Sequence, residues 1–175
     1  MTVTIHSATE SSPRLIIRDL GIDTNIESVG ITTDGYMDTP SQSNTVAWYK
    51  HGARWGENGN TTITGHYNDS AGNPAVFAKL HTLNIGATIE IKTDQSSYIF
   101  EVSRSNSEEF DSISLLDLFG ERMESRLNLI TCHGERKQSP ERYSHRWIIR
   151  ADLRNTALKP TATRRLNSED AASRP

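Results

Sequence analysis

The chain contains one cysteine, Cys132, at the end of an apolar, β-favouring stretch (127–131) that stops at the polar residues 133 and 134. A thiol with an ordinary pKa is mostly protonated at neutral pH, so it needs a nearby imidazole or cation to act as a nucleophile. Histidines elsewhere in the chain could supply that imidazole. The residue types permit nucleophilic catalysis, but free cysteine is also among the residues most often buried in a core. A catalytic and a structural Cys132 therefore both stay open at this point.

Two further residues stand at predicted strand ends. A β-branched run (61–64) stops at Gly65 and His66, and Arg146 comes directly before the apolar strand 147–149. In a β-barrel such ends can converge on one rim even when they are distant in sequence. A guanidinium stays protonated at any usable pH, so an arginine there orients substrate or stabilises an oxyanion and does not act as a base. Arg142 competes for this role, because it also precedes the last strand.

A zinc-binding module is a rival interpretation of the same residue types. His66, Cys132, His133 and His145 are its candidate ligands. Structural zinc usually takes several cysteines at short spacing, so this pattern argues against a metal, and we expect no cofactor. Successive strand residues also point to opposite faces, so Cys132 and His133 share a site only if the strand has already ended. Without such a site, His51, His81 and His145 are expected on the surface.

The elements that must position these residues are mostly short strands. We expect them at 14–18, 26–31, 61–64, 88–92, 98–102, 127–132 and 146–153, with a hairpin turn at 34–35 and a short core-facing segment at 46–49. Apolar spacing predicts short helices at 74–83 and 111–118, and a polar loop is expected at 134–144. About eight short strands with two or three short helices predict a mainly β fold, a closed or nearly closed mixed β-barrel.

The length and the net charge of the chain limit its domain organisation and the kinds of partner that it could bind. The 175 residues suffice for one substantial core, which we place at 14–154, between a flexible N-terminal arm (1–13) and a polar, disordered C-terminal tail (155–175). The net charge of −3 and the absence of a basic stripe argue against a nucleic-acid partner. No apolar run approaches the roughly 18 residues of a membrane span, so the chain contacts a membrane only if an anchor precedes it. We expect a monomer.

Three motifs resemble those of a known family. Thr64-Gly65-His66, Leu129-Ile130-Thr131-Cys132 and Arg146-Trp147-Ile148-Ile149 are similar, in order and spacing, to the catalytic motifs of the sortases, cysteine transpeptidases of bacterial surfaces. Residues 34–38 with Pro40, 46–49 and 74–77 look like the class F, actinobacterial-type branch, whereas Cys132-His133 is more similar to class E. The resemblance covers residues 14–153.

The resemblance implies an activity and a set of site residues. His66, Cys132 and Arg146 would be catalytic, and Thr64, Thr131 and His133 are weaker candidates for substrate binding. A sortase, a hydrolase of the cysteine endopeptidase class, would cleave a C-terminal sorting peptide through a thioacyl-enzyme and transfer it to an amine. The implied partners are the sorting signal of a surface protein and an acceptor such as a peptidoglycan precursor or a pilin lysine, at the outer face of a bacterial membrane.

The alternative is a protein without catalysis. In that case the chain is a β-barrel binding module, Cys132 is buried and His66 only packs against its neighbours. The exposure of the thiol separates these two hypotheses, because a buried thiol stays unreactive until the protein unfolds.

Overall fold

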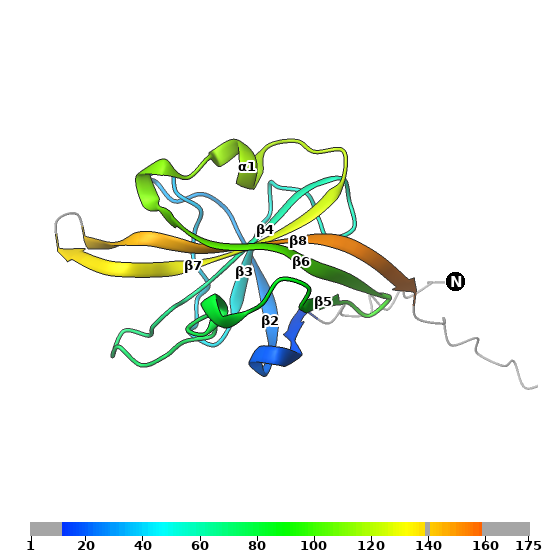
Figure 1. Ribbon diagram of the computed structural model, residues 1–175, viewed down its shortest axis with the longest axis horizontal. Coiled ribbons are helices and arrows are strands. Elements are labelled where there is room, and N and C mark those ends of the chain that lie inside the picture. Colours follow the sequence, from blue (N-terminus) through cyan, green and yellow to red (C-terminus); the bar gives the residue numbers. More distant parts are fainter. Residues whose placement is uncertain (1–11, 139–140, 159–175) are drawn as a thin grey trace, which may run out of the picture.

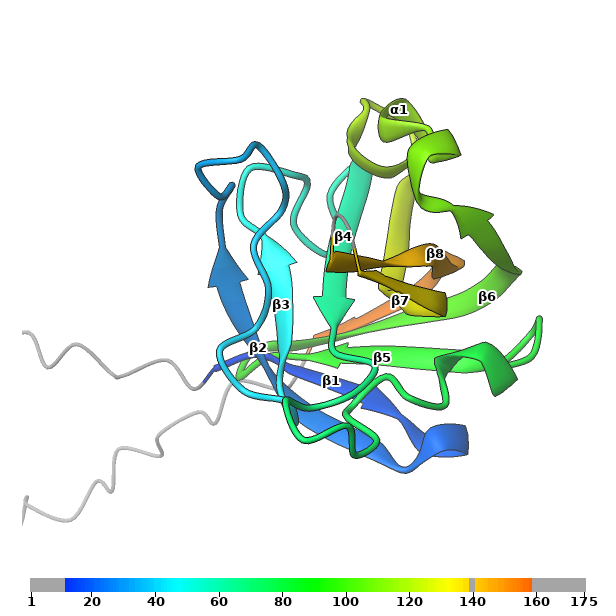
Figure 2. The ribbon, with the colours of Figure 1, turned by 90° about the vertical axis from the view of Figure 1, so that its left-hand side faces the viewer.

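A computed structural model describes residues 12–138 and 141–158 and contains a closed eight-stranded barrel. The order around the barrel is β1-β2-β3-β4-β7-β8-β6-β5, with parallel pairs β2–β3 and β4–β7 and otherwise antiparallel neighbours (Figures 1 and 2). The predicted mixed β-barrel is therefore confirmed. The strands are β1 (Arg14–Ile17), β2 (Ile22–Val29), β3 (Val46–Tyr49), β4 (Gly59–Gly65), β5 (Thr88–Lys92), β6 (Ser96–Glu109), β7 (Ser125–Gln138) and β8 (Glu141–Leu158).

Alternating residues of the strands fill the barrel. In β7 the inward residues Leu127 and Leu129 are fully buried, and in β8 Ile149 and Ala151 occupy the same core. Period-two alternation sends the intervening residues to the outer surface, where the connection between β6 and β7 covers part of them (Figure 1). This outer surface is the one that matters for function.

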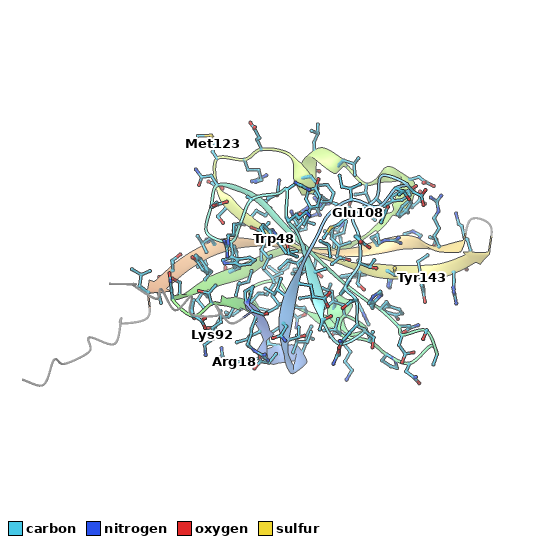
Figure 3. All side chains as sticks on the ribbon, turned by 180° about the vertical axis from the view of Figure 1, so that it is seen from behind. Arg18, Trp48, Lys92, Glu108, Met123 and Tyr143 are labelled. Carbon is cyan, nitrogen blue, oxygen red and sulfur yellow. The ribbon has the colours of Figure 1, made fainter. Side chains whose placement is uncertain are left out.

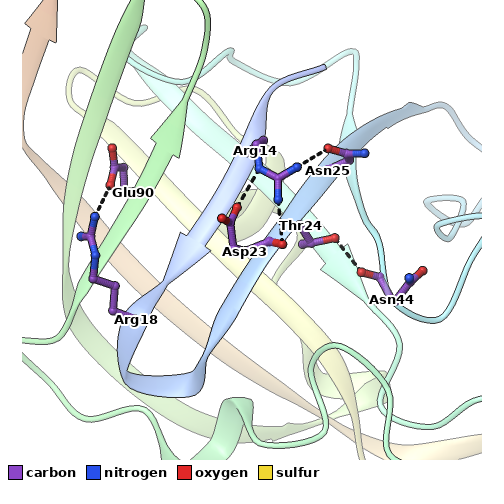
Figure 4. A network of polar contacts seen from close by, with 7 residues as sticks. All are labelled: Arg14, Arg18, Asp23, Thr24, Asn25, Asn44 and Glu90. Carbon is purple, nitrogen blue, oxygen red and sulfur yellow. Dashed lines mark hydrogen bonds and ion pairs between the residues drawn. The ribbon is translucent and has the colours of Figure 1, made fainter. Parts of the chain in front are cut away.

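A polar network joins the first strands to their neighbours (Figure 4). Arg14 of β1 donates to the carboxylate of Asp23 at 2.7 Å and to the side-chain oxygen of Asn25 at 2.9 Å, both on β2. Arg18 forms a 3.3 Å ion pair with Glu90 of β5. These contacts lie across the same two edges at which the backbone of β1 pairs with β2 and with β5 and so closes the barrel.

The expected helix at 74–83 is wrong. Only a short 3-10 turn, η2 (Leu80–Thr82), forms there, like η1 (Arg18–Leu20) after β1. The amide of Val76 donates to Ser43 and that of Phe77 to His66, so these backbone groups bond to other segments rather than to a helix. Phe77 and Leu80 are nevertheless fully buried, which explains their apolar spacing.

The connection between β6 and β7 contains two short elements where one helix was expected at 111–118. They are the 3-10 turn η3 (Phe110–Ser112) and α1 (Leu115–Phe119), which Ser114 caps by accepting a hydrogen bond from the amide of Asp117. The Thr62 hydroxyl of β4 donates to the carbonyl oxygen of Leu118 at 2.5 Å. α1 is thereby fastened over the outer surface of β4.

The expected loop at 134–144 is instead a long hairpin. β7 and β8 stay paired beyond the barrel, with Arg136 opposite Tyr143 and a bulge at Gly134, whose φ of 81° suits glycine (Figure 1). β8 also runs to Leu158, paired with Ser96, so residues 155–158 are strand and not the start of the tail. Most of the predicted arm and the rest of the tail lie outside the described residues.

Candidate active site

Cys132 and Arg146 are neighbours across two strands. They lie directly opposite each other in the antiparallel β7–β8 pair. Directly opposite residues project from the same face of a sheet. Because Leu127 and Leu129 of β7 point into the core, alternation turns Cys132 toward the outer surface. The thiol and the guanidinium therefore share one face outside the barrel.

His66 reaches the same place from the other side of β7. β4 runs parallel to β7 with Thr64 beside Ile130. The Thr131 hydroxyl donates a 2.8 Å hydrogen bond to the carbonyl oxygen of Gly65, so the alignment persists to the end of β4. The same register, continued by one residue, sets His66 alongside the cysteine. The three residues expected to be catalytic thus come from adjacent strands, with the thiol on the central one.

Specific contacts hold both the imidazole ring and the backbone of His66. The His66 Nε2 lies 3.0 Å from the carbonyl oxygen of Pro40. A carbonyl oxygen only accepts, so Nε2 carries a proton and, in a neutral ring, Nδ1 is the free acceptor. The amide of Phe77 donates to the His66 carbonyl oxygen at 3.0 Å, and a Cβ at Gly65 would come within 2.5 Å of the Phe77 ring. Gly65 is therefore required for this packing.

Glu27 secures the loop that contacts His66. Its carboxylate accepts hydrogen bonds from the amide and the hydroxyl of Ser41, both at 3.0 Å, and from the hydroxyl of Thr45. Burial alone would raise the pKa of Glu27, but these hydrogen bonds and the nearby charge of His66 hold it below its usual value. The carboxylate therefore stays ionised and ties the Pro40 segment to β2.

Charge and burial act in opposite directions on the thiol. Burial raises the pKa of Cys132, and the positive charge of Arg146 partly offsets this increase. The Arg146 Nη1 donates to the carbonyl oxygens of Tyr143 and His145 at 3.2 and 2.9 Å, and its guanidinium carbon lies 4.5 Å from the centroid of the Phe110 ring. Cys132 is half-buried, so the free thiol is mostly protonated at neutral pH but borders a fixed cation.

The three weaker candidates for substrate binding do not all lie on this face. Thr64 precedes His66 by two residues and so projects the same way, with its hydroxyl 3.3 Å from the Ile130 carbonyl oxygen. Thr131 is buried, and its hydroxyl is used by the bond to β4. His133 projects from the opposite face of β7. The structure therefore brings only Thr64 to the thiol's side of the sheet.

His133 belongs to a cluster of rings at the mouth of the barrel. Its ring centroid lies 5.0 Å from that of Trp147, 6.2 Å from that of His81 and 6.5 Å from that of Tyr67. Burial, and then the charges of His81 and His145, lower the pKa of His133. Its imidazole is therefore packed among rings and is not a partner of Cys132.

Arg142 was expected in a loop, but it lies in β8 on the hairpin, near Tyr143, which is labelled in Figure 3. Its guanidinium pairs with the carboxylate of Asp111 at 2.9 Å, and its central carbon lies 4.5 Å from the Phe110 centroid. The charge of Arg142 is thus already balanced by a carboxylate, whereas Arg146 is opposite the thiol.

Sequence reasoning missed Phe110 and the loop around Pro40 as parts of the site. Phe110 is a lone aromatic between acidic residues, and Pro40 contributes a backbone carbonyl, so neither carries a pattern that points to a role. In the described part of the chain, no group of three or more His, Cys, Asp or Glu side chains is arranged to hold a metal ion. No described helix is both long and apolar enough to cross a membrane.

The chain matches known proteins in both sequence pattern and structure. The Sortase domain family model matches residues 15–154, whereas no curated protein matches the sequence significantly. A Clostridium perfringens sortase D5 transpeptidase superposes with a TM-score of 0.62 at 25% identity, over 82% of this chain and 79% of that one. Sortase A of Listeria monocytogenes gives 0.64 at 14% identity, over 84% and 89%, and a sortase from Actinomyces oris named SrtA gives 0.64 at 20%, over 84% and 81%.

These matches decide the family but not the subclass. The family model spans most of the barrel, including His66 directly after β4, Cys132 within β7 and Arg146 within β8. Class F stays a prediction from the sequence. With the barrel topology and this arrangement of residues, the match establishes that the chain belongs to the sortase family of cysteine transpeptidases.

Proposed function

We propose that Cys132 is the nucleophile of a reaction that cleaves a C-terminal sorting peptide and joins its N-terminal part to an amine. The observation that carries this proposal is the strand register. Cys132 lies opposite Arg146 in the β7–β8 pair, and the register of the β4–β7 pair, continued past Thr64, brings His66 alongside Cys132. Each residue type suits one role in acyl transfer: a thiol attacks, an imidazole moves protons and a guanidinium binds an oxyanion.

In the first half of the reaction, the thiolate of Cys132 attacks the carbonyl carbon of the scissile peptide bond. The C–N bond breaks, His66 donates a proton to the departing amine, and a thioester remains on the cysteine. In the second half, an incoming amine attacks the thioester, the C–S bond breaks, Cys132 leaves as the thiolate, and His66 accepts the proton of the amine. The sequence of steps is balanced without a metal, a cofactor or a redox change.

Arg146 would contribute charge and geometry. A guanidinium presents its donors in a planar fork, which suits an oxygen that becomes negative in the transition state. The same charge favours the thiolate over the thiol of Cys132. Arg146 therefore supports both the attacking group and the oxygen that it generates.

The partners follow from this reaction. The donor would be the extended sorting signal of a bacterial surface protein. Thr64 would contact this peptide, because it is the candidate for substrate binding that lies on the same side of the sheet as the thiol. The acceptor would be an amine such as that of a peptidoglycan precursor or of a pilin lysine. The enzyme would act at the bacterial cell surface, as a monomer.

Alkylation of the native protein tests the proposal against the alternative of a binding module. With iodoacetamide, Cys132 should react in the folded state, and because burial raises its pKa the rate should keep increasing above about pH 8.5. The same protein in denaturant supplies the reference rate for a free thiol. A native rate that stays near zero at every pH, followed by rapid reaction on unfolding, would favour the binding module.

A further inference from the structure

The guanidinium groups of two arginines lie over one phenylalanine ring. The guanidinium carbons of Arg142 and Arg146 each lie 4.5 Å from the ring centroid of Phe110, which is half-buried in η3. The face of an aromatic ring carries negative potential and attracts cations at this distance. Phe110 therefore contacts the cation that borders Cys132, although it lies on the connection between β6 and β7 and not on a strand of the site.

The two cations are balanced differently. Arg142 forms an ion pair with Asp111, the residue after Phe110. Within residues 12–138 and 141–158, Arg146 has no carboxylate partner and is held by the ring and by two carbonyl oxygens. A carboxylate would neutralise the charge of Arg146, whereas a ring holds the guanidinium and leaves that charge to act on the thiol.

The contact with the ring also preserves hydrogen-bond donors. A phenylalanine ring has no oxygen or nitrogen atom, so it attracts the charge of the guanidinium without taking up its N–H groups. The Arg146 Nη1 makes both carbonyl contacts, and no described residue accepts a hydrogen bond from Nε or Nη2. Phe110 thus fixes the orientation of Arg146 while part of its edge stays available to a substrate oxygen.

Tyr36 supports the ring from another segment. It lies on the connection between β2 and β3, and its ring centroid is 5.9 Å from that of Phe110. The same connection contains Pro40, whose carbonyl oxygen contacts His66. Phe110 therefore meets the segment that positions the histidine as well as the arginines.

We propose that Phe110 is a positioning residue, whose ring holds the guanidinium of Arg146 against Cys132 with its edge turned to the substrate. The inference rests on the proposed function for its catalytic consequence, but the effect of Phe110 on the thiol does not depend on any substrate. The charged or ionisable groups that face this arrangement are Arg142, paired with Asp111, and Glu108, which lies opposite Arg146 on β6 and forms a 2.9 Å ion pair with Arg150. These groups and His66 are retained in the variants below.

The first test compares three variants on one peptide substrate. Phe110→Leu removes the ring and should lower kcat about tenfold with KM changed less than about twofold, because the loss is in orientation and not in substrate contact. Phe110→Trp keeps an aromatic face and should stay within about twofold of the wild type. Phe119→Leu is the matched control, since Phe119 is also half-buried on this connection and contacts Tyr49 but neither arginine. Thermal unfolding checks that each variant folds.

The second test needs no substrate. The pH profile of Cys132 alkylation by iodoacetamide should move to higher pH in Phe110→Leu, return in Phe110→Trp and be unchanged in Phe119→Leu. If no peptide is turned over but this shift appears, the proposed function fails and the role of Phe110 stands. The role of Phe110 is overturned if Phe110→Leu matches the wild type in both tests, or if Phe110→Trp is as impaired as Phe110→Leu.

Discussion

The two faces of the β7–β8 pair use similar residue types in different ways. On the outer face, Cys132 and Arg146 lie opposite each other, and the guanidinium is held without a carboxylate among the described residues. On the inner face, His133 and Trp147 pack ring to ring with His81 at the end of the barrel core. One face keeps charge and hydrogen-bond donors available, whereas the other uses its polar rings for packing.

The difference follows from register rather than from residue type. Two histidines are candidates for the base that serves Cys132. His133 is its neighbour in the sequence, and His66 is its neighbour on the adjacent strand. A one-residue shift of β7 would exchange the two faces and place His133 outside. The hydrogen bond from Thr131 to Gly65 opposes such a shift, because it fixes β7 against β4 at the residue before the thiol.

The largest effect should come from removing the thiol. Cys132→Ala should abolish peptide transfer and leave the melting temperature nearly unchanged, since the side chain is small and only half-buried. Transfer is measured by mass detection of the joined product. Residual turnover above about one part in a thousand would contradict the assignment of Cys132 as nucleophile, because a catalytic set that acts as a unit loses nearly all activity with one member.

The two histidines beside the site test the comparison between faces directly. His66→Ala should reduce kcat/KM nearly as much as Cys132→Ala, because the leaving amine then receives no proton. His133→Ala should cost far less, since its ring lies on the inner face with Trp147. The opposite ranking would move the proton donor to His133 and would break the distinction between the faces.

A smaller effect separates the two arginines on the outer face. Arg146→Lys keeps the charge but loses the planar fork, so kcat/KM should fall by about a hundredfold. Arg142→Lys should lower kcat/KM by no more than about threefold, because the guanidinium of Arg142 is already paired with the carboxylate of Asp111. Both variants are measured on the same peptide. If kcat/KM is near the wild-type value in Arg146→Lys and strongly reduced in Arg142→Lys, then Arg142 is the residue whose guanidinium binds the substrate.

The smallest effect concerns stability on the inner face. The pKa of His133 is lowered in the folded protein, so the unfolded chain binds more protons as the pH falls, and stability should decline below the unfolded pKa of about 6.5. His133→Gln should reduce the drop in melting temperature between about pH 7.5 and pH 5.5, with His51→Gln as the control. Equal slopes in the two variants and the wild type would contradict packing of His133 as a neutral ring.

The sequence predicts the barrel and the end of β4 at Gly65 well because those signals are local, but β7 runs past Cys132 and β8 begins before Arg146. Apolar alternation marks β5 and the start of β7, and abrupt polar residues mark where Cys132 and His66 appear. Alternation also predicts that Cys132 and His133 diverge if the strand continues. In the structure the strand does continue, because β7 runs to Gln138, so the side chains of Cys132 and His133 point to opposite faces.

Other features depend on partners that the sequence does not reveal. The hairpin beyond Gly134 is polar on both sides, so it has no apolar alternation and is stabilised by pairing between its own strands. The apolar residues near Phe77 have helical spacing, yet their amides bond to distant segments and no long helix forms. The contacts of Phe110 with two arginines join residues more than thirty positions apart in the chain, and no local pattern marks them.

The most direct measurement is the mass of the protein during reaction with a panel of sorting-type peptides. The wild type should gain the mass of an N-terminal peptide fragment, the adduct should map to Cys132, and it should disappear when an amine acceptor is added. His133→Ala should form the same adduct, and Cys132→Ala should form none. Peptide cleavage by Cys132→Ala, an adduct on another residue, or no adduct with any peptide while Cys132 alkylates only after unfolding would contradict the account.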